Sequence, residues 1–129
     1  MRGGGVLLAV KSSFQTKIIN LVQVSELFQH IDGIDIVGLQ VSNFNHVLYV
    51  FVVYIPPFDT RTETKNMIEG FEVFYLRYGP ELLIVGDFNL PTYINSISGA
   101  STPPVSNLNA LCSLLMLKQY NFVRNSMGR

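Results

Sequence analysis

Three polar residues stand where apolar stretches of the sequence end. Asp87 and Asn89 follow the apolar stretch Leu82–Val85. Tyr54 closes another apolar stretch, directly before Ile55-Pro56-Pro57. A buried strand fixes the backbone and the loop after it leaves side chains accessible, so an acid and an amide two residues apart can point into one cleft. Asp87 could then transfer a proton while Asn89 orients a substrate.

Each of these residues also has a purely structural interpretation. Asp87 and Asn89 could simply close a tight turn with Gly86, since short polar side chains favour turns. Tyr54 could be a core residue whose hydroxyl is satisfied by a neighbour. Spacing alone leaves both interpretations open.

The other reactive side chains are predicted to have structural roles. His30 precedes a turn and His46 opens a strand, so both are expected to be surface or core histidines. The single cysteine, Cys112, lies in a helical apolar stripe and is expected to be a core thiol. Five carboxylates fall on predicted turns or on a solvated helix face and are expected to take no part in catalysis: Asp32, Asp35, Glu63, Glu69 and Glu72.

The composition indicates a packed domain rather than a disordered tail. Hydrophobic residues make up 48% of the 129 residues, and charged residues only 14%. Soluble domains typically contain about 25% charged residues, so some faces are expected to be covered by other chain. Nine basic residues balance nine acidic ones. Contact with DNA would therefore have to be local, because no basic stripe is present.

No segment predicts insertion into a membrane or secretion. The apolar run Val47–Ile55 is about half of the roughly 18 residues that a membrane-spanning helix needs. Val6–Val10 is too short for the apolar part of a signal peptide. One cysteine cannot form an internal disulfide. We therefore expect no membrane partner, no disulfide partner, no secretion and an intracellular location.

Apolar patterning predicts a mixture of strands and helices in one domain. Strands are expected at 6–10, 34–41 and 46–55, the last two forming an antiparallel hairpin around a turn at 42–45, and a further buried strand at 81–85. Thr60 and Glu63 form a capping box before a helix predicted over 61–77.

Other parts of the chain are less informative. Residues 14–30 fit neither a helix nor a strand well, and 91–107 form a polar loop. Leu108, Leu111, Cys112 and Leu115 predict a second amphipathic helix, capped by Ser106.

Three motifs in order resemble the endonuclease domain of LINE-type (non-LTR) retrotransposons, a branch of the endonuclease/exonuclease/phosphatase superfamily. They are Gly3-Gly4-Gly5-Val6, Tyr54-Ile55-Pro56-Pro57, and the run from Leu83 to Pro91, which reads LIVGDFNLP. The segment Gln119–Arg129 is similar to the stretch that precedes that family's Leu-Asp strand. The resemblance covers nearly the whole chain.

The resemblance implies a catalytic role for three residues. Tyr54 would be the family's active-site tyrosine, Asp87 its acid/base aspartate, and Asn89 the amide that orients the phosphate. A divalent metal, usually Mg²⁺, would polarise the scissile phosphate while water attacks in line and nicks DNA. The resemblance also implies a nuclear location.

The chain departs from the family's pattern in two places. The family's opening asparagine and metal-binding glutamate precede the glycine-rich segment, at which this sequence begins. The family's closing Ser-Asp-x-His element has no counterpart here either. The metal ligands are thus unknown, and the 129 residues are expected to be an inactive internal fragment of a single domain, because acid/base groups typically contribute about 10² to 10⁴-fold in rate.

The expected fold is α/β, with a mixed, mostly antiparallel sheet and helices on its outer face. The resemblance implies that this sheet is part of a two-sheet sandwich of the DNase I-like type. The first expected function is a metal-dependent DNA endonuclease. The alternatives are a phosphoesterase of the same fold acting on lipid or inositol phosphates, and a non-catalytic remnant that associates with other chains through exposed sheet edges.

Overall fold

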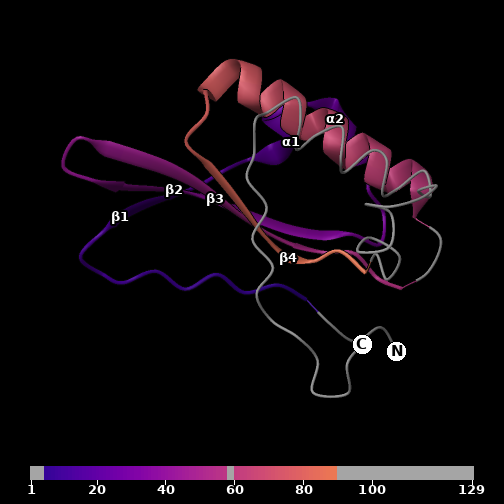
Figure 1. Cartoon of the computed structure of the whole chain (residues 1–129), viewed down its shortest axis with the longest axis horizontal. Coiled ribbons are helices and arrows are strands. Elements are labelled where there is room, and N and C mark those ends of the chain that lie inside the picture. The colour runs from indigo at the N-terminus through magenta and orange to yellow at the C-terminus, as the bar shows by residue number, and fades with distance from the viewer. Residues whose placement is uncertain (1–4, 58–59, 90–129) are drawn as a thin grey trace, which may run out of the picture.

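The computed structural model describes residues 5–57 and 60–89 of the chain. One four-stranded sheet, ordered β1-β2-β3-β4, forms the centre of this part. Figure 1 shows the helices α1 and α2 on the same side of the sheet. The strands are β1 (Gln15–Ile18), β2 (Asp35–Asn43), β3 (His46–Tyr54) and β4 (Leu82–Asp87), and the helices are α1 (Leu21–Val24), the 3-10 helix η1 (Glu26–Gln29) and α2 (Arg61–Tyr78).

The predicted hairpin is confirmed, with a tighter turn than expected. β2 and β3 are antiparallel, and Asn43 pairs with His46, so Phe44 and Asn45 alone connect the strands. Phe44 takes the left-handed conformation with φ 51°. Two-residue hairpin loops need positive φ because their twist then matches that of the strands. The strands consequently extend through much of the segment predicted as a turn.

β4 joins the sheet by a parallel crossover. The chain leaves β3, passes through α2 and returns in β4, which lies parallel to β3. Two antiparallel pairs and one parallel pair make the mixed, mostly antiparallel sheet that the sequence predicts. Helix α2 agrees closely with the predicted 61–77 and ends at Gly79, whose φ is 89° and whose N–H donates to the Tyr75 carbonyl.

The predicted capping box does not form at the start of α2. Thr60 is the N-cap residue, but its side chain makes no capping hydrogen bond. The Thr60 hydroxyl instead lies 3.2 Å from the hydroxyl of Thr64, and both threonines are buried. Burial explains the difference, because a buried hydroxyl needs a partner and Thr64 supplies one on the covered side of the helix.

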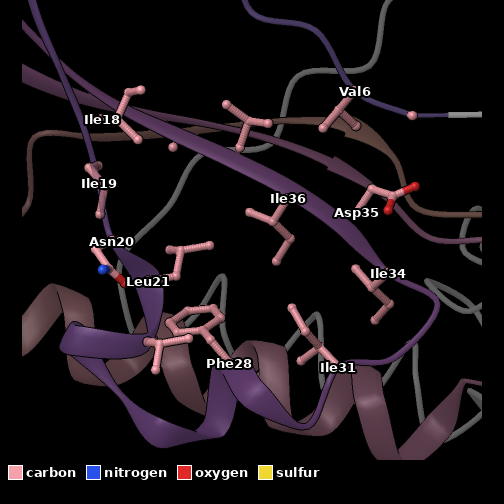
Figure 2. A pocket seen from close by; sticks show the side chains of 14 residues that line it. Val6, Ile18, Ile19, Asn20, Leu21, Phe28, Ile31, Ile34, Asp35 and Ile36 are labelled. Carbon is pink, nitrogen blue, oxygen red and sulfur yellow. The ribbon is translucent and has the colours of Figure 1, made fainter.

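The connection from β1 to β2 packs on the same side of the sheet as α2 (Figure 1). Asn20 caps α1 by accepting a hydrogen bond from the Gln23 N–H, and Ser25 caps η1 by accepting one from Leu27 N–H. Figure 2 shows Leu21 and Phe28 of these short helices directed toward Ile36 of β2. Residues 14–30, which the sequence leaves unassigned, therefore supply an edge strand and two short helical turns.

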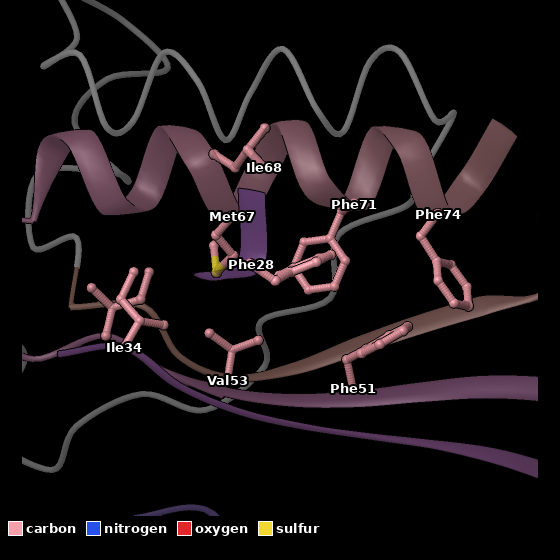
Figure 3. Close-up of a cluster of buried hydrophobic side chains, with 9 residues drawn as sticks. Phe28, Ile34, Phe51, Val53, Met67, Ile68, Phe71 and Phe74 are labelled. Atoms are coloured by element: carbon pink, nitrogen blue, oxygen red, sulfur yellow. The ribbon is translucent and has the colours of Figure 1, made fainter. Parts of the chain in front are cut away.

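The hydrophobic core lies between α2 and the sheet. Phe51 of β3 is fully buried and meets Phe71 and Phe74 of α2 edge to face, with ring centroids 5.1 and 4.9 Å apart. Phe28 of η1 contacts Phe71 in the same way at 5.6 Å. Figure 3 shows Phe51 and Val53 pointing up from the sheet toward these rings. Edge-to-face pairs stabilise beyond the area they bury, so this cluster fixes α2 on β3.

The opposite side of the sheet, here called the helix-free face, carries aliphatic side chains in register. Side chains alternate between the two faces of a strand, so the residues between the core positions of each strand point to this side. Leu83 and Val85 are 46% and 40% exposed there. Strand 81–85 was predicted to be buried, but only its other face is covered. The helix-free face consists of Ile18, Val37, Leu39, Val41, Leu48, Val50, Val52, Leu83 and Val85.

The predicted strand at Val6–Val10 is wrong. Residues 6–10 have no regular secondary structure, and Leu7 is 87% exposed. An apolar run becomes a strand only where it pairs with a neighbouring strand, and residues 6–10 pair with none of the four strands. A second sheet is not present among the described residues. The predicted elements at 91–107 and 106–115, with Cys112, lie outside those residues.

Candidate functional site

The candidate site lies at the carboxyl ends of the two parallel strands. Tyr54 and Asp87 are the last residues of β3 and β4, and they are direct register partners. The Ile55 N–H continues the pairing by donating to the Asp87 carbonyl at 2.8 Å. In α/β sheets, ligands bind where the carboxyl ends of parallel strands open into loops. The structure thus brings together two residues that are 33 positions apart in the sequence.

Asn89 is tied to both strands. Its backbone N–H donates to Oδ1 of Asp87 at 3.0 Å, and its side-chain Nδ2 donates to the Ile55 carbonyl at 2.6 Å. Its φ of 45° is left-handed, a conformation that asparagine tolerates better than most residues. The hydrogen bond between the Asn89 N–H and Asp87 Oδ1 confirms that these two residues close a tight turn. It does not exclude a role in binding, because the same bonds hold the two side chains beside Tyr54.

Gly86 sets the spacing of the two strands at this point. Its φ is 150°, and a Cβ built on it would lie 1.8 Å from the Val53 carbonyl oxygen. Backbone cannot move aside as a flexible side chain can, so only glycine allows β4 to approach β3 this closely. Asp87 follows directly, and its position opposite Tyr54 depends on this approach.

The three residues are accessible to different degrees. Asp87 is exposed, whereas Tyr54 and Asn89 are half-buried. Tyr54 points to the helix-free face, since its neighbours Val53 and Ile55 belong to the core. The alternative that Tyr54 is a core residue is therefore wrong. Asp87 was predicted in the turn after β4, but it is the last residue of the strand itself.

Asp35 joins this row, although the sequence assigned it no part in a site. It begins β2 and is the register partner of Tyr54 on the side away from Asp87. Asp35, Tyr54 and Asp87 therefore lie side by side across three strands on the helix-free face. The alternation along 34–41 was visible in the sequence, but the pairing register was not, and register alone decides which residues are neighbours.

The remaining candidates lie apart from the row or on exposed positions. His46 is at the opposite end of β3 from Tyr54, about 26 Å away at roughly 3.3 Å per residue. His30 is exposed, and its carbonyl accepts a hydrogen bond from Asn66 Nδ2 at 2.9 Å. Glu69 lies on α2, with its carboxylate 3.9 Å from Lys65 Nζ. Asp32 is exposed, and Glu63 and Glu72 are half-buried on α2.

The described residues do not by themselves fit a metal ion. No three His, Cys, Asp or Glu side chains within 5–57 and 60–89 are grouped so that they could hold one. Strand β3 lies between Asp35 on β2 and Asp87 on β4, and neighbouring strands are about 4.8 Å apart. The two carboxylates therefore lie two strand spacings apart. The expected Mg²⁺ therefore has no ligand set in this part of the chain.

A separate hollow in the described part of the chain is mainly apolar. A cavity of about 740 Å³ opens between α1, η1 and the free edge of β2. Figure 2 shows Ile19, Phe28, Ile34 and Ile36 around it, with Asp35 at its rim. Its lining is largely aliphatic and also includes Ile18 and Val37 of the helix-free face, so the hollow extends around the free edge of β2.

No helix in the described ranges has the length and apolarity required to cross a membrane.

Comparisons with known proteins identify no relative of this chain. No protein-family model, no curated protein and no solved structure matches the chain.

Proposed function

We propose that the chain is part of a metal-dependent DNA endonuclease domain of the endonuclease/exonuclease/phosphatase type, as carried by non-LTR retrotransposons. One observation carries the proposal. The three residues that resemble the family's tyrosine, aspartate and asparagine lie together at the carboxyl ends of β3 and β4, on an accessible part of the sheet. The pairing of β3 with β4 makes Tyr54 and Asp87 neighbours although they are 33 positions apart in the sequence.

Each residue has a task that its position supports. Asp87 is exposed, so its carboxylate can accept or return a proton at the scissile phosphodiester. The Tyr54 hydroxyl, in the neighbouring strand, can donate to a phosphate oxygen. Asn89 holds the loop in place and fixes the Asp87 carboxylate through the bond to Oδ1. No step is assigned to a metal, because the described residues supply no ligand set.

We also propose that the sheet is one half of a two-sheet sandwich. The aliphatic rows of the helix-free face support this, since two sheets pack through their apolar faces about 10 Å apart. Val52 and Val85 lie one row below Tyr54 and Asp87. A second sheet over the aliphatic rows would leave the Tyr54–Asp87 row at the rim of the sandwich, where substrate could reach it.

A second candidate function is the hydrolysis of a small phosphate ester, such as a lipid or inositol phosphate. The charge of the chain favours it, because nine basic residues balance nine acidic ones and a long polyanion gains little from a neutral protein. The site and the roles of Tyr54 and Asp87 would be unchanged. A panel of soluble inositol phosphates and duplex DNA separates the two substrates.

The test is a nicking assay on supercoiled plasmid with the 129-residue chain and Mg²⁺, at high protein concentration and long incubation. Asp87→Asn is the main variant, because it removes the carboxylate but keeps an oxygen for the Asn89 N–H. Glu81→Gln is the matched control, since Glu81 is exposed and directly precedes β4, whose last residue is Asp87. Any residual nicking by the chain should fall by about 10² to 10⁴-fold in Asp87→Asn and should not change in Glu81→Gln.

Binding provides the second measurement, because the full catalytic set of the family is not expected in these residues. Fluorescence anisotropy with a labelled duplex should show binding that weakens as salt is raised. A folded chain that neither binds nor nicks DNA would contradict the proposal. Turnover of an inositol phosphate without DNA nicking would favour the second candidate, and activity untouched by Asp87→Asn would remove this site from both.

A further inference from the structure

Phe44 stands at the tip of the β2–β3 hairpin in a backbone conformation that its residue type disfavours. It is the first of the two loop residues and has φ 51°, whereas Asn45, the second, does not have a positive φ. This is the pattern of a type II′ turn, whose first loop residue is usually glycine. A bulky side chain at positive φ is an outlier, and such strain occurs often at functional sites. The turn itself therefore gives no reason for a phenylalanine.

Packing gives no reason for Phe44 either. The residue is 98% exposed, the largest exposed fraction of any large hydrophobic residue in the part of the chain that the structure describes. Figure 1 shows the hairpin extending well beyond the helices. A single exposed apolar residue is ordinary, but this one is also held at positive φ. Its ring offers two open faces on which a flat partner could stack.

The residues beside this ring are polar and accessible. Asn43, Asn45 and His46 are all exposed, and their amide and imidazole groups can donate and accept hydrogen bonds. The turn before β1 lies at the same end of the sheet, because Gln15, which follows that turn, pairs with Ser42 near the hairpin tip. Two neighbouring turns thus surround the ring with groups that suit a polar partner.

The charged side chains of these two turns and their strands are basic. Lys11 lies in the turn before β1 and Lys17 lies on β1, and both are exposed. Residues 11–18 and 40–48 contain no acidic residue. Glu81 lies on the far side of β3 from β1, directly before β4. An aromatic ring beside two lysines is complementary to a partner that is both flat and anionic.

We propose that Phe44 stacks on a base of single-stranded nucleic acid, with Lys11 and Lys17 near its phosphates. Every base has a flat face, so stacking on an aromatic side chain beside basic groups binds a single strand without sequence preference. In a duplex the bases already stack on one another and leave no free face for the ring. A lipid surface is disfavoured, because one ring among amides offers little apolar area for insertion.

This contact is separate from the proposed active site. His46, beside the tip, is about 26 Å from Tyr54 at roughly 3.3 Å per residue along β3. The proposal therefore does not rest on cleavage or on a metal ion, and it can fail or hold independently of the proposed function.

A tryptophan at the tip provides a direct test. The sequence contains no tryptophan, so Phe44→Trp introduces a single indole at the tip of the hairpin. Titration with a single-stranded DNA oligonucleotide should quench its fluorescence, because the indole then stacks on a base. The duplex form of the same oligonucleotide should quench it much less. Leu76→Trp is the matched control, since Leu76 is 83% exposed on α2, and its emission should not change.

Phe44→Gly separates binding from stability. Glycine suits the positive φ, so the variant should be at least as resistant to urea as the parent chain. Its affinity for the single strand, measured by fluorescence anisotropy, should nevertheless fall by about 5-fold to 100-fold. Phe44→Tyr keeps a ring and should bind like the parent. Lys11→Ala should weaken binding and reduce its dependence on salt.

Three results would overturn the proposal. These are no quenching of Phe44→Trp by single-stranded DNA, an affinity that Phe44→Gly leaves unchanged, and a blue shift of Phe44→Trp with anionic phospholipid vesicles in place of quenching by DNA. Quenching by single-stranded DNA without any nicking of plasmid would support this contact while the endonuclease proposal fails. Nicking without quenching would support the endonuclease proposal and remove this contact.

Discussion

The side-chain amide of Asn89 donates to the carbonyl of Ile55 at 2.6 Å, which ties the loop after β4 to the end of β3. This bond gives Asn89 a structural role in addition to any role toward substrate. The loss of activity in an Asn89 variant would consequently have two possible causes. Asp87→Asn, which keeps the local hydrogen bond, is the cleaner probe of chemistry.

Asn89→Ala should destabilise the fold by about 2 kcal/mol. About 1 kcal/mol comes from the lost hydrogen bond, and about 1 kcal/mol from placing alanine at a left-handed φ of 45°. Asn89→Gly loses the same bond without the backbone cost and should lose only about 1 kcal/mol. Urea denaturation measures both. Equal losses for the two variants would mean that the backbone conformation at residue 89 carries no cost.

Gly86→Ala should be far more damaging than Gly79→Ala. The new Cβ at 86 would meet the Val53 carbonyl oxygen at 1.8 Å, whereas a Cβ at 79 would meet nothing within 4 Å. Both positions have positive φ, so Gly79→Ala should cost only about 1–2 kcal/mol of backbone strain. Gly86→Ala should cost at least about 3 kcal/mol or prevent folding. Thermal or urea unfolding of the two variants measures these losses. Similar losses of stability in Gly86→Ala and Gly79→Ala would contradict the predicted clash at residue 86.

Thr64→Val should destabilise the fold by about 1–3 kcal/mol, because it leaves the buried Thr60 hydroxyl without its partner. Thr64→Ser keeps the hydroxyl and should cost less than about 1 kcal/mol. Glu63→Ala should change stability by less than about 1 kcal/mol, since no capping hydrogen bond forms at Thr60 and only the weak attraction of the carboxylate to the helix N-terminus is lost. Should Glu63→Ala prove as harmful as Thr64→Val in chemical denaturation, the capping box would be present after all.

Tyr54→Phe should reduce any residual nicking by about 10-fold to 100-fold, the value of one hydrogen bond to a charged phosphate. The stability of the fold should hardly change, because Tyr54 is half-buried and lies outside the core. Tyr49→Phe is the control, since Tyr49 is on the same strand but packs against Phe74 on the helix side. Initial rates on supercoiled plasmid decide the matter, and equal effects of the two substitutions would argue against a role for the Tyr54 hydroxyl.

Local features of the sequence predicted most of the regular elements. The apolar periodicity of α2, the break at Gly79, and the alternation along β2 and β3 are properties of short segments, and such segments form the same element in most surroundings. Tyr54, Asp87 and Asn89 were identified because each follows an apolar run. Their roles in chemistry remain a prediction that awaits measurement.

The sequence by itself determined which segments are helices and strands and which polar residues stand at their ends. Only the tertiary structure decided which of those ends meet. Asp35 joins Tyr54 because of the β2–β3 register, and Val6–Val10 is not a strand because it pairs with none of the four strands. Thr60 turns to Thr64 because both are buried. Periodicity belongs to the local chain, whereas register, pairing and burial depend on contacts between segments that are distant in sequence.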